Sequence, residues 1–148
     1  MDMFGVFDIS SAGMSVEQTR LATAASNLAN ARTTKMADGT LYQPLSVVVR
    51  SSGVRTGSYA DVEATMRAGA LPRPYVSSVA QIPTAPRLVY DPGHPDADAK
   101  GFVSMPGVDT LSTMMDLISV SRGYEANLRA FDITRHLIQK TIDMGRNR

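Results

Sequence analysis

The sequence predicts an α+β fold in which long helices at the two ends of the chain pair as a coiled coil, with a small β-rich module between them. All eight prolines lie between Pro44 and Pro106, and proline breaks a helix because it lacks an N–H donor and clashes with the preceding turn. Apolar residues recur every seven positions in both proline-free flanks, which is typical of paired helices. We therefore expect an N-terminal helix within residues 1–31, a central β-rich region over 32–107 and a C-terminal helix within 108–148.

The N-terminal flank has one heptad series and little charge. The series is Phe7, Met14, Leu21 and Leu28. Six alanines between Ala12 and Ala31 raise the helix propensity and make the helix thin, so that a neighbouring backbone can come close. We expect Phe7, Leu21 and Leu28 to be packing anchors.

The C-terminal flank, about residues 108–144, carries two heptad series. One contains Met114, Ser121, Leu128, Arg135 and Ile142, and the other contains Leu117, Tyr124, Phe131 and Ile138. Asp109 is placed to cap the helix N-terminus, and Gly145 to end the helix. Gly123 should cost on the order of 1 kcal/mol relative to alanine within a helix, which predicts close packing at that position, with a local kink as the second explanation. The expected anchors on this helix are Leu117, Tyr124, Leu128, Phe131 and Ile138.

The length of the C-terminal helix favours assembly with other chains. A helix of about 37 residues spans roughly 55 Å at 1.5 Å per residue, whereas a compact globule of 148 residues has a diameter of roughly 40 Å. The shorter N-terminal helix can cover only part of the longer stripe. We expect the remainder to be covered by other copies of the chain or by other proteins.

The central region alternates turn residues with short runs of β-type composition. Strands are expected over 45–49, 62–66, 76–82, 87–90 and 102–105. Asp38-Gly39 predicts a turn, and residues 50–60, which contain Ser, Gly and Thr, predict a mobile loop.

Composition and motifs exclude most chemical functions. The formal net charge is +1, which argues against nucleic-acid binding, and the chain has two histidines and no cysteine. There is no phosphate-binding loop and no G-x-S-x-G element. We expect no enzymatic activity, cofactor, metal or small-molecule substrate. No apolar run approaches the ~20 residues of a membrane span, and residues 1–9 lack the basic segment of a secretory signal peptide.

The segment from Asp91 to Asp98 contains three aspartates and His94, but it does not fit a calcium loop. With Asp96 as the first ligand, Lys100 and Gly107 occupy positions that require oxygen ligands. We expect a structural loop whose aspartates bond nearby backbone amides.

Two polar pairs have both structural and functional interpretations. Arg122 and Arg129, seven residues apart, fit a solvated or salt-bridged helix face, and also contacts between protomers. Asn27 and Asn30 are poor helix formers, so they indicate a helix end near Ala31, amide-to-backbone contacts with adjacent helices, or both.

Two terminal motifs resemble those of the bacterial flagellar rod and hook proteins. At the N-terminus these are Phe7-Asp8-Ile9-Ser10, Gly13-Met14 and Ala24-Ala25-Ser26-Asn27-Leu28-Ala29-Asn30-Ala31. At the C-terminus the counterpart is Ser121-Arg122-Gly123-Tyr124-Glu125-Ala126-Asn127-Leu128. Within that family, the short chain and the segment 88–103 are most similar to proximal rod proteins. Residues 51–75 match no part of the family pattern.

The resemblance implies a structural subunit that leaves the cytoplasm through the flagellar type III export apparatus. It implies polymerisation, with other copies and other rod proteins, into the torque-transmitting rod of the basal body in the periplasmic space. The terminal helices would form the inner layer of a tube and the central region an outer β domain. The alternative is another type III axial or hook-basal-body subunit, or a needle-like helical assembly protein.

Overall fold

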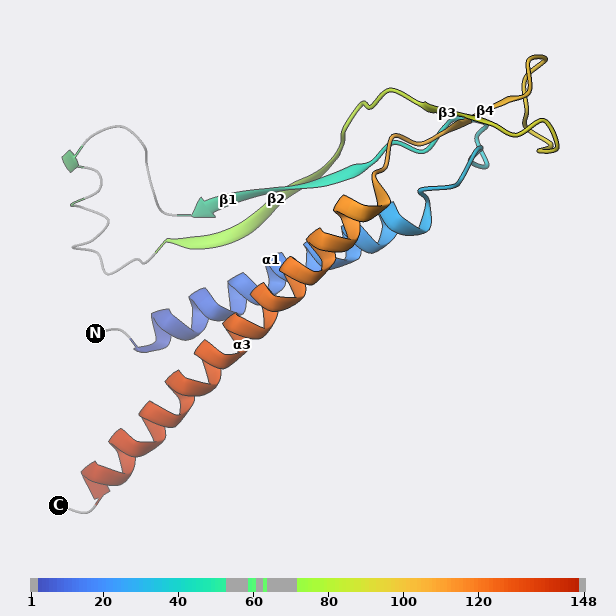
Figure 1. Cartoon of the computed structure of the whole chain (residues 1–148). Helices are drawn as coiled ribbons and strands as arrows, with labels where there is room; N and C mark the ends of the chain where they lie inside the picture. The colour runs from blue at the N-terminus through green and yellow to red at the C-terminus, as the bar shows by residue number, and fades with distance from the viewer. Residues whose placement is uncertain (1–2, 53–58, 61–62, 64–71, 147–148) are drawn as a thin grey trace. The chain divides into compact units, whose positions relative to one another are not determined.

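The computed structural model describes residues 3–52, 59–60, 63 and 72–146, and confirms the α+β class. Two long helices, α1 (Met3–Ala29) and α3 (Thr110–Arg146), flank four strands in chain order. The strands are β1 (Leu45–Ser52), β2 (Arg73–Gln81), β3 (Arg87–Tyr90) and β4 (Phe102–Met105) (Figure 1).

The predicted start of α3 agrees with the structure, and its predicted end does not. Asp109 caps the N-terminus of α3 as predicted, because its Oδ1 accepts hydrogen bonds from the backbone N–H groups of Leu111 (3.0 Å) and Ser112 (3.4 Å). The prediction that Gly145 ends the helix was wrong, since α3 continues through Arg146. A glycine costs stability inside a helix but does not forbid the conformation.

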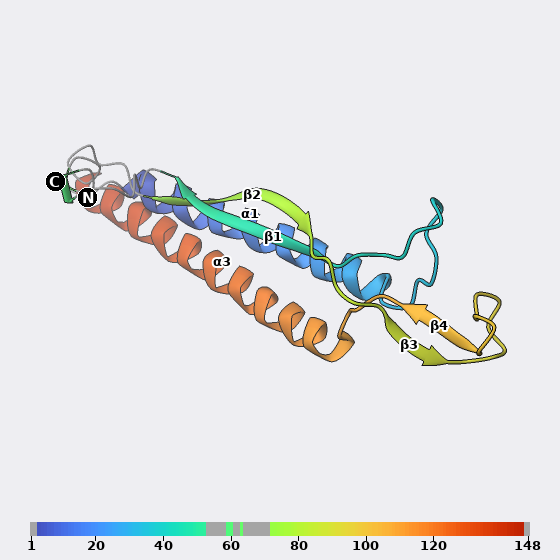
Figure 2. The same cartoon turned by 90° about the horizontal axis from the view of Figure 1, so that it is seen from above.

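The strands form two separate two-stranded sheets. Strand β1 pairs with β2, and the arrows of these strands run in opposite directions in Figure 2. Strand β3 pairs antiparallel with β4, with Arg87 opposite Met105 and Tyr90 opposite Phe102. Strands β3 and β4 have the predicted bounds.

Two expectations for the central region need correction. Residues 50–52 belong to β1 rather than to a mobile loop, and 53–58, the rest of that loop apart from Tyr59 and Ala60, lie outside the described residues. Apart from Glu63, which is in helical conformation, the strand expected over 62–66 also lies outside them.

The chain divides into two compact units, each containing parts of both long helices and of both strands of the first sheet. One unit comprises Met1–Thr19, Val49–Ser77 and Val120–Arg148, and the other Arg20–Val48 and Ser78–Ser119. In the first unit, Arg73 at the start of β2 forms an ion pair with Asp8 of α1 (Nη2–Oδ2 2.8 Å).

The second unit contains a small apolar cluster. Ala31, Tyr42 and Val108 are buried together, with Leu45 packed against them. In the β3–β4 hairpin, Val103 is fully buried. Because successive side chains of a strand point to opposite faces, its neighbour Phe102 lies on the other face, where its ring meets Tyr90 edge to face (centroids 5.3 Å apart).

The predicted Asp38-Gly39 turn is present in the same unit. Gly39 has a φ of +83°, a left-handed conformation that residues with a side chain rarely adopt. Hydrogen bonds from the backbone N–H (2.9 Å) and the hydroxyl of Thr40 (2.7 Å) to Asp38 Oδ1 lower the pKa of the Asp38 carboxyl.

Candidate assembly surface

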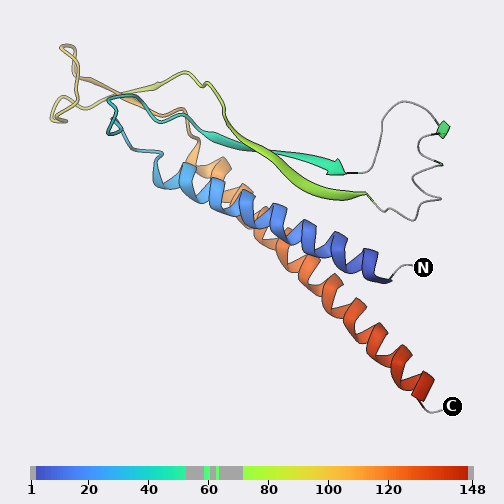
Figure 3. The ribbon, with the colours of Figure 1, turned by 180° about the vertical axis from the view of Figure 1, so that it is seen from behind.

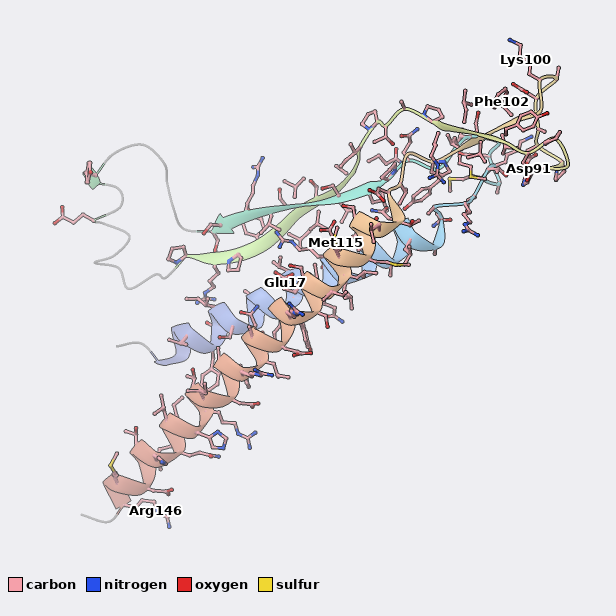
Figure 4. All side chains as sticks on the ribbon, in the orientation of Figure 1. Glu17, Asp91, Lys100, Phe102, Met115 and Arg146 are labelled. Carbon is pink, nitrogen blue, oxygen red and sulfur yellow. The ribbon has the colours of Figure 1, made fainter. Side chains whose placement is uncertain are left out.

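In the first unit the two long helices pack side by side in antiparallel orientation (Figures 1 and 3). The rings of Phe7 and Phe131 meet edge to face with centroids 4.7 Å apart. About two turns further along α1, Gly13 lies against Asn127, and about one turn beyond it Glu17 lies against Gly123 (Figure 4 labels Glu17). Residue numbers thus increase along α1 as they decrease along α3, which confirms that the two helices are antiparallel here. The sequence predicted both phenylalanines as anchors, and they do contact each other.

The closest approach of the two helices is at Gly13 rather than at Gly123. A Cβ atom built on Gly13 would lie 2.9 Å from Asn127 Oδ1, which is too close for the side chains to stay as they are. A Cβ on Gly123 would meet Glu17 at 3.4 Å, an ordinary van der Waals contact. The prediction that close packing requires Gly123 was therefore wrong. Periodicity locates a helix, but it does not show which glycine faces a polar side chain of the partner.

In the second unit, the side chain of Asn27 binds the backbone of β1. Its Nδ2 donates to Leu45 O (2.8 Å), and its Oδ1 accepts from Leu45 N (2.8 Å) and from the Tyr42 hydroxyl (2.8 Å). The amide thereby occupies both backbone hydrogen-bonding groups of Leu45, as a neighbouring strand would. Within the chain, the partner of Asn27 is a strand rather than an adjacent helix.

Asn30 has a local role at the helix end. Its Nδ2 donates to Ser26 O (2.9 Å) in the same helix, and its Oδ1 accepts from the Thr33 hydroxyl (3.3 Å). Tyr42 is one of the site residues that the sequence did not predict. Its position two residues before Pro44 gave no helical or strand pattern, and its partner Asn27 lies 15 residues away.

Helix α3, all of whose residues are described, contains no buried residue. The half-buried positions follow one stripe, namely Thr113, Leu117, Val120, Gly123, Asn127, Phe131, Thr134 and Ile138. Ten large apolar side chains on α3 are 40–68% exposed: Leu111, Met114, Met115, Ile118, Tyr124, Leu128, Ile133, Leu137, Ile142 and Met144. An apolar surface of this kind on a protein subunit marks an interaction site.

The remaining predicted anchors differ in burial. Leu28, Leu117 and Ile138 are half-buried, whereas Leu21, Tyr124 and Leu128 are about two-fifths exposed. Of the two heptad series, the one with Leu117, Tyr124, Phe131 and Ile138 is therefore the more buried, although Tyr124 itself is exposed. The contribution of these residues to assembly stays a prediction.

The predicted arginines lie on an exposed part of α3. Arg129 approaches Glu125, one turn earlier, at 3.9 Å (Nη2–Oε2), and both side chains are mostly in solvent. Such an exposed pair contributes little to stability. Within the part of the chain that the structure describes, Arg122 forms no ion pair.

In the aspartate-rich loop, Asp91 and Asp98 bond nearby backbone amides, as predicted. Asp91 Oδ1 accepts from Gly93 N (3.2 Å), and Asp98 Oδ1 accepts from Lys100 N (2.8 Å) and Phe102 N (2.9 Å). Figure 4 labels Asp91, Lys100 and Phe102 at this end of the hairpin. Among the residues with described positions, no group of three or more His, Cys, Asp or Glu side chains could hold a metal ion. In the described helices there is no stretch long and apolar enough to cross a lipid bilayer.

Comparison with known proteins identifies the family. A model described as "Flagella basal body rod protein" matches residues 7–35, and one described as "Flagellar basal body rod FlgEFG protein C-terminal" matches residues 99–144. The chain is 35% identical to the flagellar basal-body rod protein FlgC of Yersinia enterocolitica, with 98% of this chain and 99% of the relative covered. The chain belongs to the FlgC family. The FlgC of Aquifex aeolicus is 36% identical, with 97% of both chains covered, and that of Bacillus subtilis is 33% identical, with 99% and 100% covered.

FlgC membership places the chain among structural proteins of the flagellar basal-body rod rather than among enzymes. It also decides between the predicted rod subunit and the alternative of another axial or needle-like protein. The two family models match segments that contain α1 from Phe7 to its last residue and α3 as far as Met144. The signature of the family thus includes nearly all of α3, the helix that exposes the apolar surface.

Proposed function

We propose that the chain is a subunit of the proximal rod, built into the torque-transmitting shaft through its terminal helices. The supporting observation is that α3, over 37 residues, buries none of them and exposes ten large apolar side chains. Burial of apolar surface stabilises a structure by about 25 cal/mol per Å², so covering these side chains with neighbouring subunits would strongly favour assembly. In this proposal α1 and α3 form the inner, coiled-coil layer and the residues between them an outer layer.

We further propose that the subunit is exported by the flagellar type III apparatus and that assembly completes its folding. Most of the stability of a helix in a protein comes from packing of its apolar face rather than from intrinsic propensity. With no buried residue on α3, much of the helix beyond its contacts with α1 would be loosely ordered in the free monomer and would become ordered in the rod. Strong amide-exchange protection over residues 117–142 of a verified monomer would contradict this.

Substitution of an exposed apolar residue tests the assembly role. Leu137 is 57% exposed on α3, so Leu137→Asp should leave the monomer as helical as the parent protein, but should prevent its incorporation into rods. Gln139→Asp is the matched control, because it introduces the same charge at an exposed polar position of the same helix turn. The readouts are circular dichroism of the monomer and the number of rod-containing basal bodies in a strain that lacks its own copy of the gene.

Leu128→Asp and Phe131→Asp extend the test to predicted anchors. Both should block incorporation, and Phe131→Asp should also loosen the contact with Phe7. Normal rod assembly with Leu137→Asp and Leu128→Asp would refute the proposal that this surface joins subunits.

A further inference from the structure

The part of α3 in the first unit carries two parallel rows of opposite charge on the side away from α1. The basic row consists of Arg122, Arg129 and Lys140, and the acidic row of Glu125, Asp132 and Asp143. A helical residue turns about 100° relative to its predecessor, so each row lies within about 20° on the helix surface. Measured from Phe131, which faces α1, the acidic row lies at roughly 110° and the basic row at roughly 170°.

These charges are largely unsatisfied within the chain. All six residues are exposed. The contact of Arg129 with Glu125 measures 3.9 Å, and the other four form no ion pair among residues that the structure describes. Exposed apolar side chains border both rows, with Leu128 beside the acidic row and Ile133 and Leu137 beside the basic row.

We propose that the acidic row of one copy docks against the basic row of a second copy, with the two α3 helices parallel. This rests on the proposed assembly into a rod and names which faces of the helix meet there. Rows of charge beside an apolar seam are the device by which paired helices select partner and orientation. The same copy uses one row toward each neighbour, so the contact is heterologous and can propagate along an assembly.

The spacing of the charges selects the parallel orientation. Both rows repeat after seven and then after eleven residues. Two parallel copies can therefore form three pairs of opposite charges at once, each pair joining the basic row of one copy to the acidic row of the other. Antiparallel copies reverse the order of the intervals and can match two at most.

Complementary reversals test the contact between copies. One variant is Arg122→Glu with Arg129→Glu and Lys140→Glu, and the other is Glu125→Lys with Asp132→Lys and Asp143→Lys. Each variant alone places like charges against each other and should reduce the number of rod-containing basal bodies by roughly tenfold or more. Co-expression of the two in a strain lacking the native gene should restore rods, because a basic copy can alternate with an acidic one.

Co-expression separates contacts between copies from contacts within one helix, because each chain in the mixture still carries like charges in both of its own rows. A chain with both rows exchanged keeps every pairing between copies, so it should assemble. If the mixture makes no more rods than either variant alone, while the parent chain restores rods in the same strain, the inference is wrong. If the parent chain itself enters no rods, the proposed function fails instead. Circular dichroism must show equal helix content in all the monomers.

Discussion

Gly13 of α1 faces Asn127 of α3 so closely that a Cβ atom on the glycine would lie 2.9 Å from Asn127 Oδ1. The Asn127 amide cannot move freely, because its Nδ2 donates to Gly123 O one turn earlier in α3 (3.0 Å). The distance between the two backbones at this point is therefore set by Gly13 in one helix and, in the other, by the Asn127 side chain, which is bonded to the backbone of its own helix.

Gly13→Ala and Gly123→Ala should have opposite effects. At Gly123 there is room, so alanine should stabilise the chain by about 1 kcal/mol through helix propensity. At Gly13 the overpacking should cost about 1–3 kcal/mol, which outweighs that gain. Thermal unfolding followed by circular dichroism measures both. Adding Asn127→Ala to Gly13→Ala removes the clash, and failure of this second change to recover stability would contradict the packing argument.

Asn27→Ala should be the most harmful change in the second unit. It removes three hydrogen bonds and leaves the backbone groups of Leu45 without their partner, with an expected loss of about 2–4 kcal/mol. Tyr42→Phe removes only one of these bonds and should cost about 1 kcal/mol. Amide exchange at Leu45 is the direct readout. Asn30→Ala serves as the control because its amide bonds only within its own helix end, and equal effects at positions 27 and 30 would refute the assignment.

Asp109→Ala should fray the start of α3. The lost cap is worth about 0.5–2 kcal/mol, whereas Asp109→Asn keeps a capping oxygen and should cost less. Exchange rates of the Leu111 and Ser112 amides should rise in the alanine variant. If both variants behave alike, the carboxylate is not acting as a cap.

The Asp38 turn should respond to acid in a defined direction. The Thr40 hydrogen bonds lower the folded-state pKa of Asp38 below that of an aspartate in the unfolded chain. The stability that the ionised Asp38 gives to the fold is therefore fully present above the unfolded-state pKa. It is lost as the pH falls through the lower, folded-state pKa. Carbon-detected NMR titration of the Asp38 carboxyl measures this pKa. Thr40→Ala should raise it toward the ordinary range, and an unchanged value would show that the hydroxyl has no part in the shift.

The sequence predicted the elements better than the contacts between them. Proline placement and heptad spacing located both helices, and the β-type composition of 87–90 and 102–105 predicted β3 and β4 with their observed bounds. These are local properties of the chain. The sequence did not show which heptad series of α3 faces α1, because Leu128 and Phe131 are equally apolar and only packing distinguishes them.

The missed site residues depend on distant partners. Tyr42 and Leu45 gain their roles from Asn27, and Gly13 gains its role from Asn127, more than a hundred residues away. The sequence indicated that Asn27 needed a hydrogen-bonding partner, but no periodicity could assign that partner to a strand.

The bonds between Asn27 and Leu45 also limit what else β1 can bind. Pro44 O accepts from Ile82 N, so the next residue, Leu45, turns its backbone groups to the opposite edge of the strand. An exposed strand edge invites pairing with foreign chains, a hazard for aggregation. The side chain of Asn27 already binds both the N–H and the C=O of Leu45, so a third strand cannot pair with β1 at this residue. Subunits at high concentration are therefore protected from strand-edge aggregation at this point.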